Sequence, residues 1–163
     1  MAKTAKAPKT AGDFIVIATN SKASHNYTLG ERFEAGLVLI GSEIKSIRAR
    51  KVNLGDGYVE ERGGELWLLS VHIAEYAQAN RFGHEPLRAR KLLLHRKEIA
   101  YLIGKIRERG YALVPTRLYL KKGRAKVEIA VAKGKKDYDK RDAIATREAN
   151  LDIRRRLKEQ RFD

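Results

Sequence analysis

The sequence contains no cysteine and no long apolar run. Without cysteine, disulfide bonds, thiolate metal sites and a cysteine nucleophile are excluded. No apolar stretch approaches the about 20 residues of a membrane-spanning helix, and the N-terminus lacks the hydrophobic segment of a signal peptide. We therefore expect a soluble, cytoplasmic protein with no membrane partner.

Negative charge is also scarce, because 20 Asp and Glu face 35 Lys and Arg, which gives a net charge of +15. The excess is spread along the chain, with +3 in residues 1–11, +8 in 12–132 and +4 in 133–163. Solubility alone needs a net charge of only about 2–8 in a small domain. Basic surfaces attract polyanions, since each neutralised phosphate releases condensed counterions. The composition therefore favours a nucleic acid as partner.

Common nucleotide and metal sites do not fit the sequence. Gly134-Lys135 is followed by Lys136 rather than Ser or Thr, so it is not a phosphate-binding loop. The four histidines are too dispersed to share a helix face, so neither a metal site nor a cofactor is expected. Glu43-Ile44-Lys45 resembles a nuclease carboxylate–lysine element, but Asp13 is the only candidate for its second carboxylate. No catalytic residue is expected, and a small RNA nuclease is kept only as an alternative.

Period-two alternation of apolar residues predicts a body that is mainly β. We expect strands at 13–17, 27–40, 58–61, 66–73, 91–94, 111–120 and 125–132, and helices at 41–50 and 95–109. Residues 18–26 show neither period and are expected to form a polar loop. About six bent strands and two helices, without alternating βαβ units, indicate an α+β fold. Its centre is an antiparallel β-barrel of the oligonucleotide-binding type with two packed helices.

Local signals refine these elements. Gly63-Gly64 and Lys122-Gly123 separate strand-like runs and predict hairpins. The apolar positions change parity across Pro115, which predicts a bend or bulge there. Gly36 is expected to bend the long extended segment, and Ser42 is expected to cap the helix at 41–50.

The chain changes character after Ala132, where the alternation ends. Residues 133–163 are charged and offer one thin apolar stripe of Ile144, Leu151 and Leu157, too little to hold a helix in water. We therefore expect a disordered basic N-terminus at 1–12, an RNA-binding barrel at 13–132, and a tail at 133–163 that is disordered when free.

Two basic clusters remain. Asn20, Lys22, His25 and Tyr27 form one, and Lys45, Arg48, Arg50 and Lys51 form the other. Structured RNA is bound through backbone charge, 2′-hydroxyls and stacking on exposed bases. The clusters therefore indicate RNA more strongly than any single lysine does.

Several blocks of the sequence resemble one family. They are ATNSKASHNY (18–27), FEAGLVL (33–39), GSEIKSIR (41–48), RKLLL (90–94), VAKGKK (131–136) and DKR (139–141). Together they are similar to the small protein B family of SsrA-binding proteins, in one order over residues 13–158. Ordered blocks of this kind are more specific than any single short motif.

The resemblance implies a monomeric, non-catalytic adaptor in trans-translation. Its barrel would bind the tRNA-like domain of transfer-messenger RNA, which an elongation factor delivers to stalled ribosomes for tagging of the nascent chain. Its tail would become helical in the empty messenger channel, close to the decoding centre. Composition alone also permits a structural protein that is bound permanently to ribosomal RNA.

Two sets of site residues are expected. The RNA-binding set is Asn20, Lys22, His25, Tyr27, Glu34, Lys45, Arg48, Arg50, Lys91, Leu93, His95, Lys126, Lys133, Lys135 and Lys136. The tail set, facing the ribosome, is Asp139, Lys140, Arg141, Arg147, Arg154, Arg155 and Arg156. A carboxylate repels phosphate, so Glu34 is expected either to accept hydrogen bonds from base edges or to orient a neighbouring Lys or Arg.

Overall fold

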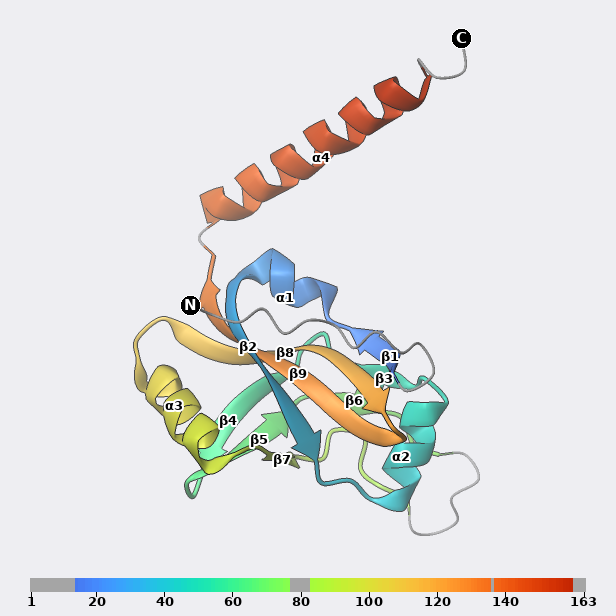
Figure 1. The fold of residues 1–163 in the computed structure, drawn as a ribbon, viewed down its shortest axis with the longest axis vertical. Helices are drawn as coiled ribbons and strands as arrows, with labels where there is room; N and C mark the ends of the chain where they lie inside the picture. Colours follow the sequence, from blue (N-terminus) through green and yellow to red (C-terminus); the bar gives the residue numbers. More distant parts are fainter. Residues whose placement is uncertain (1–13, 77–82, 136, 160–163) are drawn as a thin grey trace.

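The structure is a computed structural model that describes residues 14–76, 83–135 and 137–159 (Figure 1). Its strands are β1 (Phe14–Thr19), β2 (Tyr27–Leu37), β3 (Val52–Asn53), β4 (Tyr58–Arg62), β5 (Glu65–Leu69), β6 (His72–Ile73), β7 (Arg90–Leu93), β8 (Tyr111–Lys121) and β9 (Arg124–Gly134). Its helices are α1 (Ser21–Asn26), α2 (Gly41–Arg48), α3 (Arg96–Arg107) and α4 (Asp137–Glu159). The mainly β, antiparallel class is confirmed, with nine strands and four helices in the described residues rather than about six and two.

Six strands close into a ring of antiparallel pairs. β8 pairs with β4, β4 with β5, β5 with β7, β7 with β2, β2 with β9, and β9 returns to β8. β1 lies beside this ring and pairs with the second half of β8, from Arg117 to Lys121. The buried leucines, valines and isoleucines of the ring strands form one apolar core. Burial of this core is the main stabilising contribution to the fold.

Both predicted hairpins are confirmed. The turns after β4 and β8 place Gly63, Gly64, Lys122 and Gly123 at positive φ, the backbone that two-residue hairpin loops require. The predicted irregularity at Pro115 is confirmed as well, because the β8–β9 register shifts between Pro115 and Arg117. The segment expected at 66–73 is divided into β5 and β6 around Ser70, which has a φ of 57°.

β2 changes partner along its length. From Tyr27 to Gly36 it pairs with β9, and at Gly36 and Leu37 it also pairs with β7. The β2–β9 register shifts between Leu29 and Arg32, and the bend expected at Gly36 stays a prediction. β2 therefore links two ends of the molecule, one at α1 and the other at α2.

Helix α2 begins differently from the prediction. The residue before its first turn is Ile40, which provides no side-chain cap, so Ser42 is not the N-cap. The Ser42 hydroxyl lies 2.8 Å from Nδ1 of the buried His84, whose Nε2 lies 2.9 Å from the carbonyl of Ile73. These contacts hold the start of α2 against the segment that precedes β7.

Helix α1 occupies residues that were expected to be a loop. Its N-cap is Asn20, whose Oδ1 accepts a hydrogen bond from the Ala23 backbone at 3.2 Å. Only Ala23 of this short helix is buried, which explains why no apolar period is visible in the sequence. The prediction of a polar loop is therefore wrong for residues 21–26.

Helix α4 projects away from the sheet body in Figure 1 and contacts it near α1. It is continuous over Asp137–Glu159, and Ile144, Leu151, Ile153 and Leu157 are all exposed. The predicted single apolar stripe is wrong, because Leu157 follows Leu151 by six residues and lies about 120° away around the helix. The expectation that this tail orders only on a partner stays a prediction. Among the described helices, none is long and apolar enough to cross a membrane.

Candidate nucleic-acid interface

A cleft of ≈ 290 Å³ lies between α1 and the loop that leads into β4. It is lined by Asn20, Lys22, Ala23, Asn26, Tyr27, Gly55, Asp56, Gly57, Tyr58 and Val114. The first predicted basic cluster thus meets a second segment of the chain, more than 30 residues away. We refer to this space as the α1 cleft.

Asn20 builds the α1 cleft rather than presenting its side chain to a ligand. Its Nδ2 donates to the carbonyls of Leu54, at 3.2 Å, and Pro115, at 2.9 Å, while its Oδ1 caps α1. The residue is only 7% exposed. Asn20 therefore positions α1 against the 54–57 loop and β8, and its expected contact with RNA stays a prediction.

Lys22 is available to an incoming anion. Its Nζ lies 3.5 Å from the Asp56 carboxylate, with both side chains largely exposed. An exposed pair of this kind contributes about 0–1 kcal/mol, so a phosphate group can replace the carboxylate at low cost. Asp56 keeps the ammonium at the edge of the cleft.

Two tyrosines line the same cleft. Tyr27 is half-buried at the start of β2 and packs against Ala23, Val114 and Ala132, whereas Tyr58 is exposed. Sequence reasoning did not identify Tyr58 as a site residue. The alternation within β4 contains the signal, since Val59 faces the core and Tyr58 must then face outward.

The end of β9 borders α1. The Nζ of Lys135 donates to the Ser24 carbonyl at 3.0 Å, and the Lys135 backbone donates to the Asn26 carbonyl at 3.0 Å. Lys135 thus satisfies carbonyls at the C-terminus of α1, where a cation is favourable. Lys133 is exposed beside it and His25 lies in the last turn of α1, while Lys136 lies outside the described residues.

The second predicted cluster lies on and after α2. Lys45 is exposed, with its ammonium 5.3 Å from the centre of the Tyr76 ring, and Arg48 is exposed. Arg50 has a φ of 61° and donates to the Val16 carbonyl at 2.8 Å, so it also attaches this segment to β1. The two clusters are therefore separate surfaces of the protein.

Glu34 lies on the outer face of the ring and is engaged by its own neighbours. Its carboxylate accepts a hydrogen bond from the Tyr119 hydroxyl and lies 3.4 Å from the Lys121 ammonium. Burial, together with this hydrogen bond, raises the pKa of Tyr119 well above its ordinary value. Glu34 thus holds Tyr119 and Lys121 in the free protein, and its expected role toward RNA stays a prediction.

A second carboxylate organises the arginines beside it. Glu128 accepts from Arg32 at 3.0 Å, from Arg117 at 3.0 Å and from the Thr116 hydroxyl at 2.7 Å. Burial alone would raise the pKa of Glu128, but the Thr116 hydrogen bond and the Arg117 charge outweigh it and lower that pKa. The Arg117 guanidinium also lies 5.4 Å from the ring centres of Phe14 and Tyr119. Arg117 is therefore fixed by the protein.

The remaining RNA-binding candidates lie toward the other end of β2. Leu93 and Lys126 line one groove, and Lys91 pairs with Glu65 at 2.7 Å. His95 is the N-cap residue of α3, and its backbone N–H donates to the Glu98 carboxylate at 3.3 Å. Leu93 lies in the strand predicted at 91–94 and is 52% exposed. The structure does not bring these four residues to the α1 cleft.

The tail candidates lie along α4. Arg141, Arg147, Arg154, Arg155 and Arg156 are exposed, and Lys140 is half-buried near the start of the helix. Arg155 forms a loose ion pair with Asp152 at 3.9 Å. The Asp139 side chain lies outside the described residues. The helix thus carries cations around most of its circumference.

Glu43 cannot act as a nuclease carboxylate in this arrangement. Its oxygens lie 2.6 Å from Nε of Arg88 and 2.8 Å from Nε of Arg90, and the residue is fully buried. Within residues 14–76, 83–135 and 137–159, no three acidic, histidine or cysteine side chains are grouped to hold a metal ion. The Glu43 carboxylate therefore has a structural role, in which it neutralises the charges of the two arginines.

Comparison with known proteins identifies the family. The SmpB protein family model matches residues 17–159. An SsrA-binding protein from Symbiobacterium thermophilum is 57% identical over 87% of this chain and 90% of its own, and one from Roseiflexus sp. is 60% identical over 88% and 92%. A chain from a solved structure described as "tmRNA-SmpB: a journey to the center of the bacterial ribosome" has a TM-score of 0.63. That chain is 40% identical, over 74% of this chain and 85% of its own. The chain described here belongs to the SmpB protein family.

Proposed function

We propose that this chain is a non-catalytic adaptor that binds SsrA RNA, the transfer-messenger RNA, and brings it to stalled ribosomes for trans-translation. The α1 cleft is the observation that carries the proposal, because its exposed cation and exposed aromatic ring have no role in the core. The names of the relatives, SsrA-binding protein, support the same ligand. Transfer-messenger RNA, the elongation factor and the ribosome are the partners expected of such an adaptor.

The cleft suits a structured RNA with an unstacked base. Lys22 offers one charge to a phosphate, and Lys133 extends the basic surface along β9. Tyr58 offers an exposed ring for stacking, which contributes about 1–3 kcal/mol per base. Asn20 and Lys135 hold α1 in place, so the cleft is formed before RNA arrives. Binding therefore requires little ordering of the protein at this surface.

Helix α4 supplies the second contact in this proposal. Its exposed arginines suit ribosomal RNA, and its large aliphatic side chains are exposed as well. The decoding centre and the messenger channel are the sites proposed for it. The protein's contribution is to hold two RNAs together, and no bond-making step is assigned to it.

The RNA that copurifies with the intact chain tests the ligand directly, by sequencing. Enrichment of transfer-messenger RNA is expected, and enrichment of ribosomal RNA alone contradicts the proposal. Binding of the isolated tRNA-like domain then tests the cleft. Tyr58→Ala should weaken binding by about 1–3 kcal/mol. Lys22→Ala should reduce the dependence of the RNA-binding constant on salt concentration by the equivalent of about one phosphate contact. Tyr101→Ala and Lys97→Ala, on α3, are the matched controls.

A further inference from the structure

Four neighbouring strands, β1, β8, β9 and β2, turn one side toward the core and the other side outward (Figure 1). Residues along each strand alternate between the two sides. Ala35 and Leu118 face the core and are fully buried, so the residues next to them in the chain face outward. We refer to the outward side as the outer sheet face. Its polar side chains are Arg32, Glu34, Arg117, Tyr119, Lys121 and Glu128.

Two carboxylates face each other on the outer sheet face. Glu34 on β2 and Glu128 on β9 are direct partners in the antiparallel register. Like charges directly opposite each other destabilise a sheet, because their Cβ atoms are only about 4.5–5.5 Å apart. Each carboxylate therefore needs partners of its own, and the structure supplies two different sets.

Glu128 is bound by arginines and is largely covered. Arg32 and Arg117 each lie 3.0 Å from its carboxylate, and only 13% of its side chain is exposed. Glu128 in turn fixes Arg117, whose guanidinium lies 5.4 Å from the ring centres of Phe14 and Tyr119. The partners of Glu128 therefore lead to Tyr119 and leave little of this carboxylate for a ligand.

Glu34 is more open, since 40% of its side chain is exposed. Its Oε2 accepts a hydrogen bond from the Tyr119 hydroxyl, whereas its Oε1 lies 3.4 Å from the Lys121 ammonium. An ion pair as long and exposed as the one with Lys121 contributes little and is readily replaced. A ligand can therefore donate to Oε1 while Oε2 stays bound to Tyr119.

Tyr119 is a fixed donor for this carboxylate. The residue is only 3% exposed, and its ring centre lies 4.5 Å from that of Phe14. Burial and the hydrogen bond to Glu34 raise its pKa above the ordinary value, so the phenol keeps its proton at neutral pH. The packed ring and the retained proton together hold the Glu34 carboxylate in one orientation.

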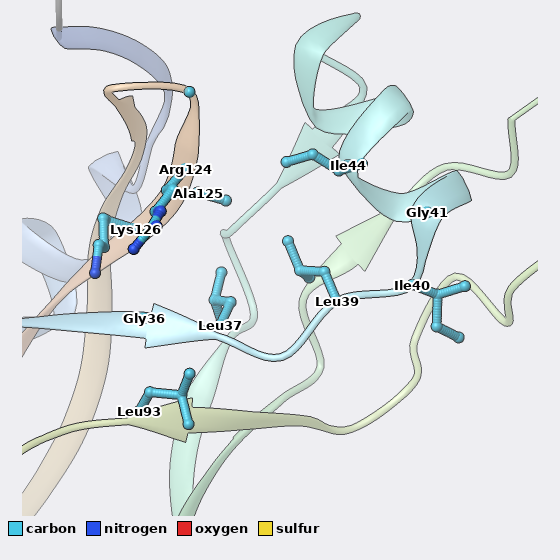
Figure 2. Close-up of a pocket in the computed structure, with 11 residues that line it drawn as sticks. Gly36, Leu37, Leu39, Ile40, Gly41, Ile44, Leu93, Arg124, Ala125 and Lys126 are labelled. Carbon is cyan, nitrogen blue, oxygen red and sulfur yellow. The ribbon is translucent and has the colours of Figure 1, made fainter.

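The surroundings of Glu34 are cationic. Arg32 and Lys121 are at least partly exposed, and Lys126 pairs in register with Tyr119. Figure 2 shows Lys126 close to Gly36, two residues beyond Glu34 on β2. A single acceptor within a basic surface suits an RNA loop, in which phosphates flank the N–H groups of an unpaired base.

We propose that Tyr119 is a positioning residue for RNA binding, which holds the Glu34 carboxylate so that Oε1 accepts a hydrogen bond from an N–H group of an unpaired base. This inference rests on the proposed function and deepens it, because it adds a base contact outside the α1 cleft. Arg32 and Lys121 remain available to the phosphates beside that base. The sequence analysis singled out Glu34 but not Tyr119, whose partner lies 85 residues away.

Removing the Tyr119 hydroxyl tests the proposal, with the isolated tRNA-like domain of SsrA RNA as the probe. Tyr119→Phe keeps the ring, and RNA affinity should fall about threefold to tenfold, the equivalent of one hydrogen bond. The dependence of the binding constant on salt should not change, because no phosphate contact is lost. Tyr101→Phe is the matched control, since its hydroxyl also donates to a carboxylate, that of Glu31, at 2.6 Å. Tyr101 lies on α3, and its variant should bind RNA as the intact chain does.

A double-mutant cycle tests whether Tyr119 acts through Glu34. Glu34→Ala should weaken RNA binding at least as much as Tyr119→Phe does. Adding Tyr119→Phe to Glu34→Ala should then change the affinity by less than about twofold, because the two residues act as one unit. Thermal unfolding is measured on the same chains, since a merely structural role would lower the melting temperature without this non-additivity in RNA binding.

The outcomes separate the two proposals. Equal RNA affinities of Tyr119→Phe and Tyr101→Phe overturn the positioning role, and so do additive losses in the double variant or a changed salt dependence in Tyr119→Phe. Normal binding by Tyr119→Phe together with weak binding by Tyr58→Ala counts against the outer sheet face alone. An intact chain that does not bind the tRNA-like domain overturns the proposed function, and this inference with it.

Discussion

Glu43 and Arg90 form an ion pair in which both side chains are fully buried, with 2.8 Å between Oε2 and Nε. Arg88 approaches the other oxygen of the same carboxylate at 2.6 Å. The Arg90 guanidinium also donates to the carbonyls of Val71 and Pro86. This network joins α2 to the start of β7, two elements that are neighbours only through tertiary structure.

Removing the Glu43 charge should destabilise the fold strongly. Glu43→Gln leaves Arg90 buried without its counter-ion, and we expect a loss of about 3–5 kcal/mol in the free energy of unfolding. Urea unfolding measures this loss. Glu65→Gln is the control, because its ion pair with Lys91 is partly exposed and should cost at most about 1 kcal/mol. Equal losses in the two variants contradict the structural role assigned to Glu43.

Substitutions of Asn20 and Lys22 should distinguish a residue that positions α1 from a residue that contacts RNA. Asn20→Ala removes a helix cap and two buried hydrogen bonds, so the free energy of unfolding should fall by about 2–4 kcal/mol. Lys22→Ala should change stability by less than about 0.5 kcal/mol and still weaken RNA binding. Thermal unfolding and a gel-shift titration give the two measurements. A stable Asn20→Ala chain that has lost RNA binding contradicts the positioning role.

Tyr119 should make the protein sensitive to alkali. Its pKa is raised above the ordinary value of 10.0, first by burial and then by the hydrogen bond to Glu34. The folded state therefore favours the protonated phenol, so this contribution is complete below about pH 10 and is lost as pH rises further. Tyr119→Phe keeps the ring beside Phe14 and Arg117 but removes the proton.

The measurement is the free energy of unfolding between about pH 8 and 11, compared in the two chains. We expect the intact chain to lose stability more steeply than Tyr119→Phe above about pH 10. Parallel curves would show that Tyr119 does not titrate differently in the folded and unfolded states. Comparing the chains pairwise cancels the contribution of the other tyrosines.

Truncation should separate the proposed roles of body and tail. A chain cut after Lys136 keeps the α1 cleft and its anchor at Lys135, so affinity for the isolated tRNA-like domain should stay within about twofold. Tagging of nascent chains on stalled ribosomes should be abolished, because α4 is missing. The intact chain is the reference for both assays. A collapse of RNA affinity identifies the tail as a primary RNA-binding arm instead.

Features set by local sequence could be predicted. The β8–β9 hairpin follows from Lys122-Gly123, and its bulge follows from the parity change at Pro115. Helix α3 follows from its apolar period, although it begins at Arg96 and ends at Arg107, inside the predicted range. Each of these depends on residues within one turn or one strand of each other.

Features set by distant partners could not be predicted. Helix α1 has no apolar period, and its cap and anchor come from Asn20 and from Lys135, more than 100 residues apart. The structural role of Glu43 depends on its ion pairs with arginines 45 and 47 residues away in the sequence. The sequence indicated which residues are basic, but only the structure divides them between the α1 cleft, α2 and the groove that Leu93 and Lys126 line (Figure 2).

The hydrogen bonds of Lys135 place this residue at the junction between α1 and α4. Its backbone and its ammonium both attach to the last turn of α1, and α4 starts two residues further along the chain. A tilt of α1 that Lys135 passed on to α4 would swing the far end of that 23-residue helix. At about 1.5 Å per residue α4 is about 35 Å long. A rotation of α4 by a few degrees about Lys135 would therefore displace its C-terminal end by several ångströms.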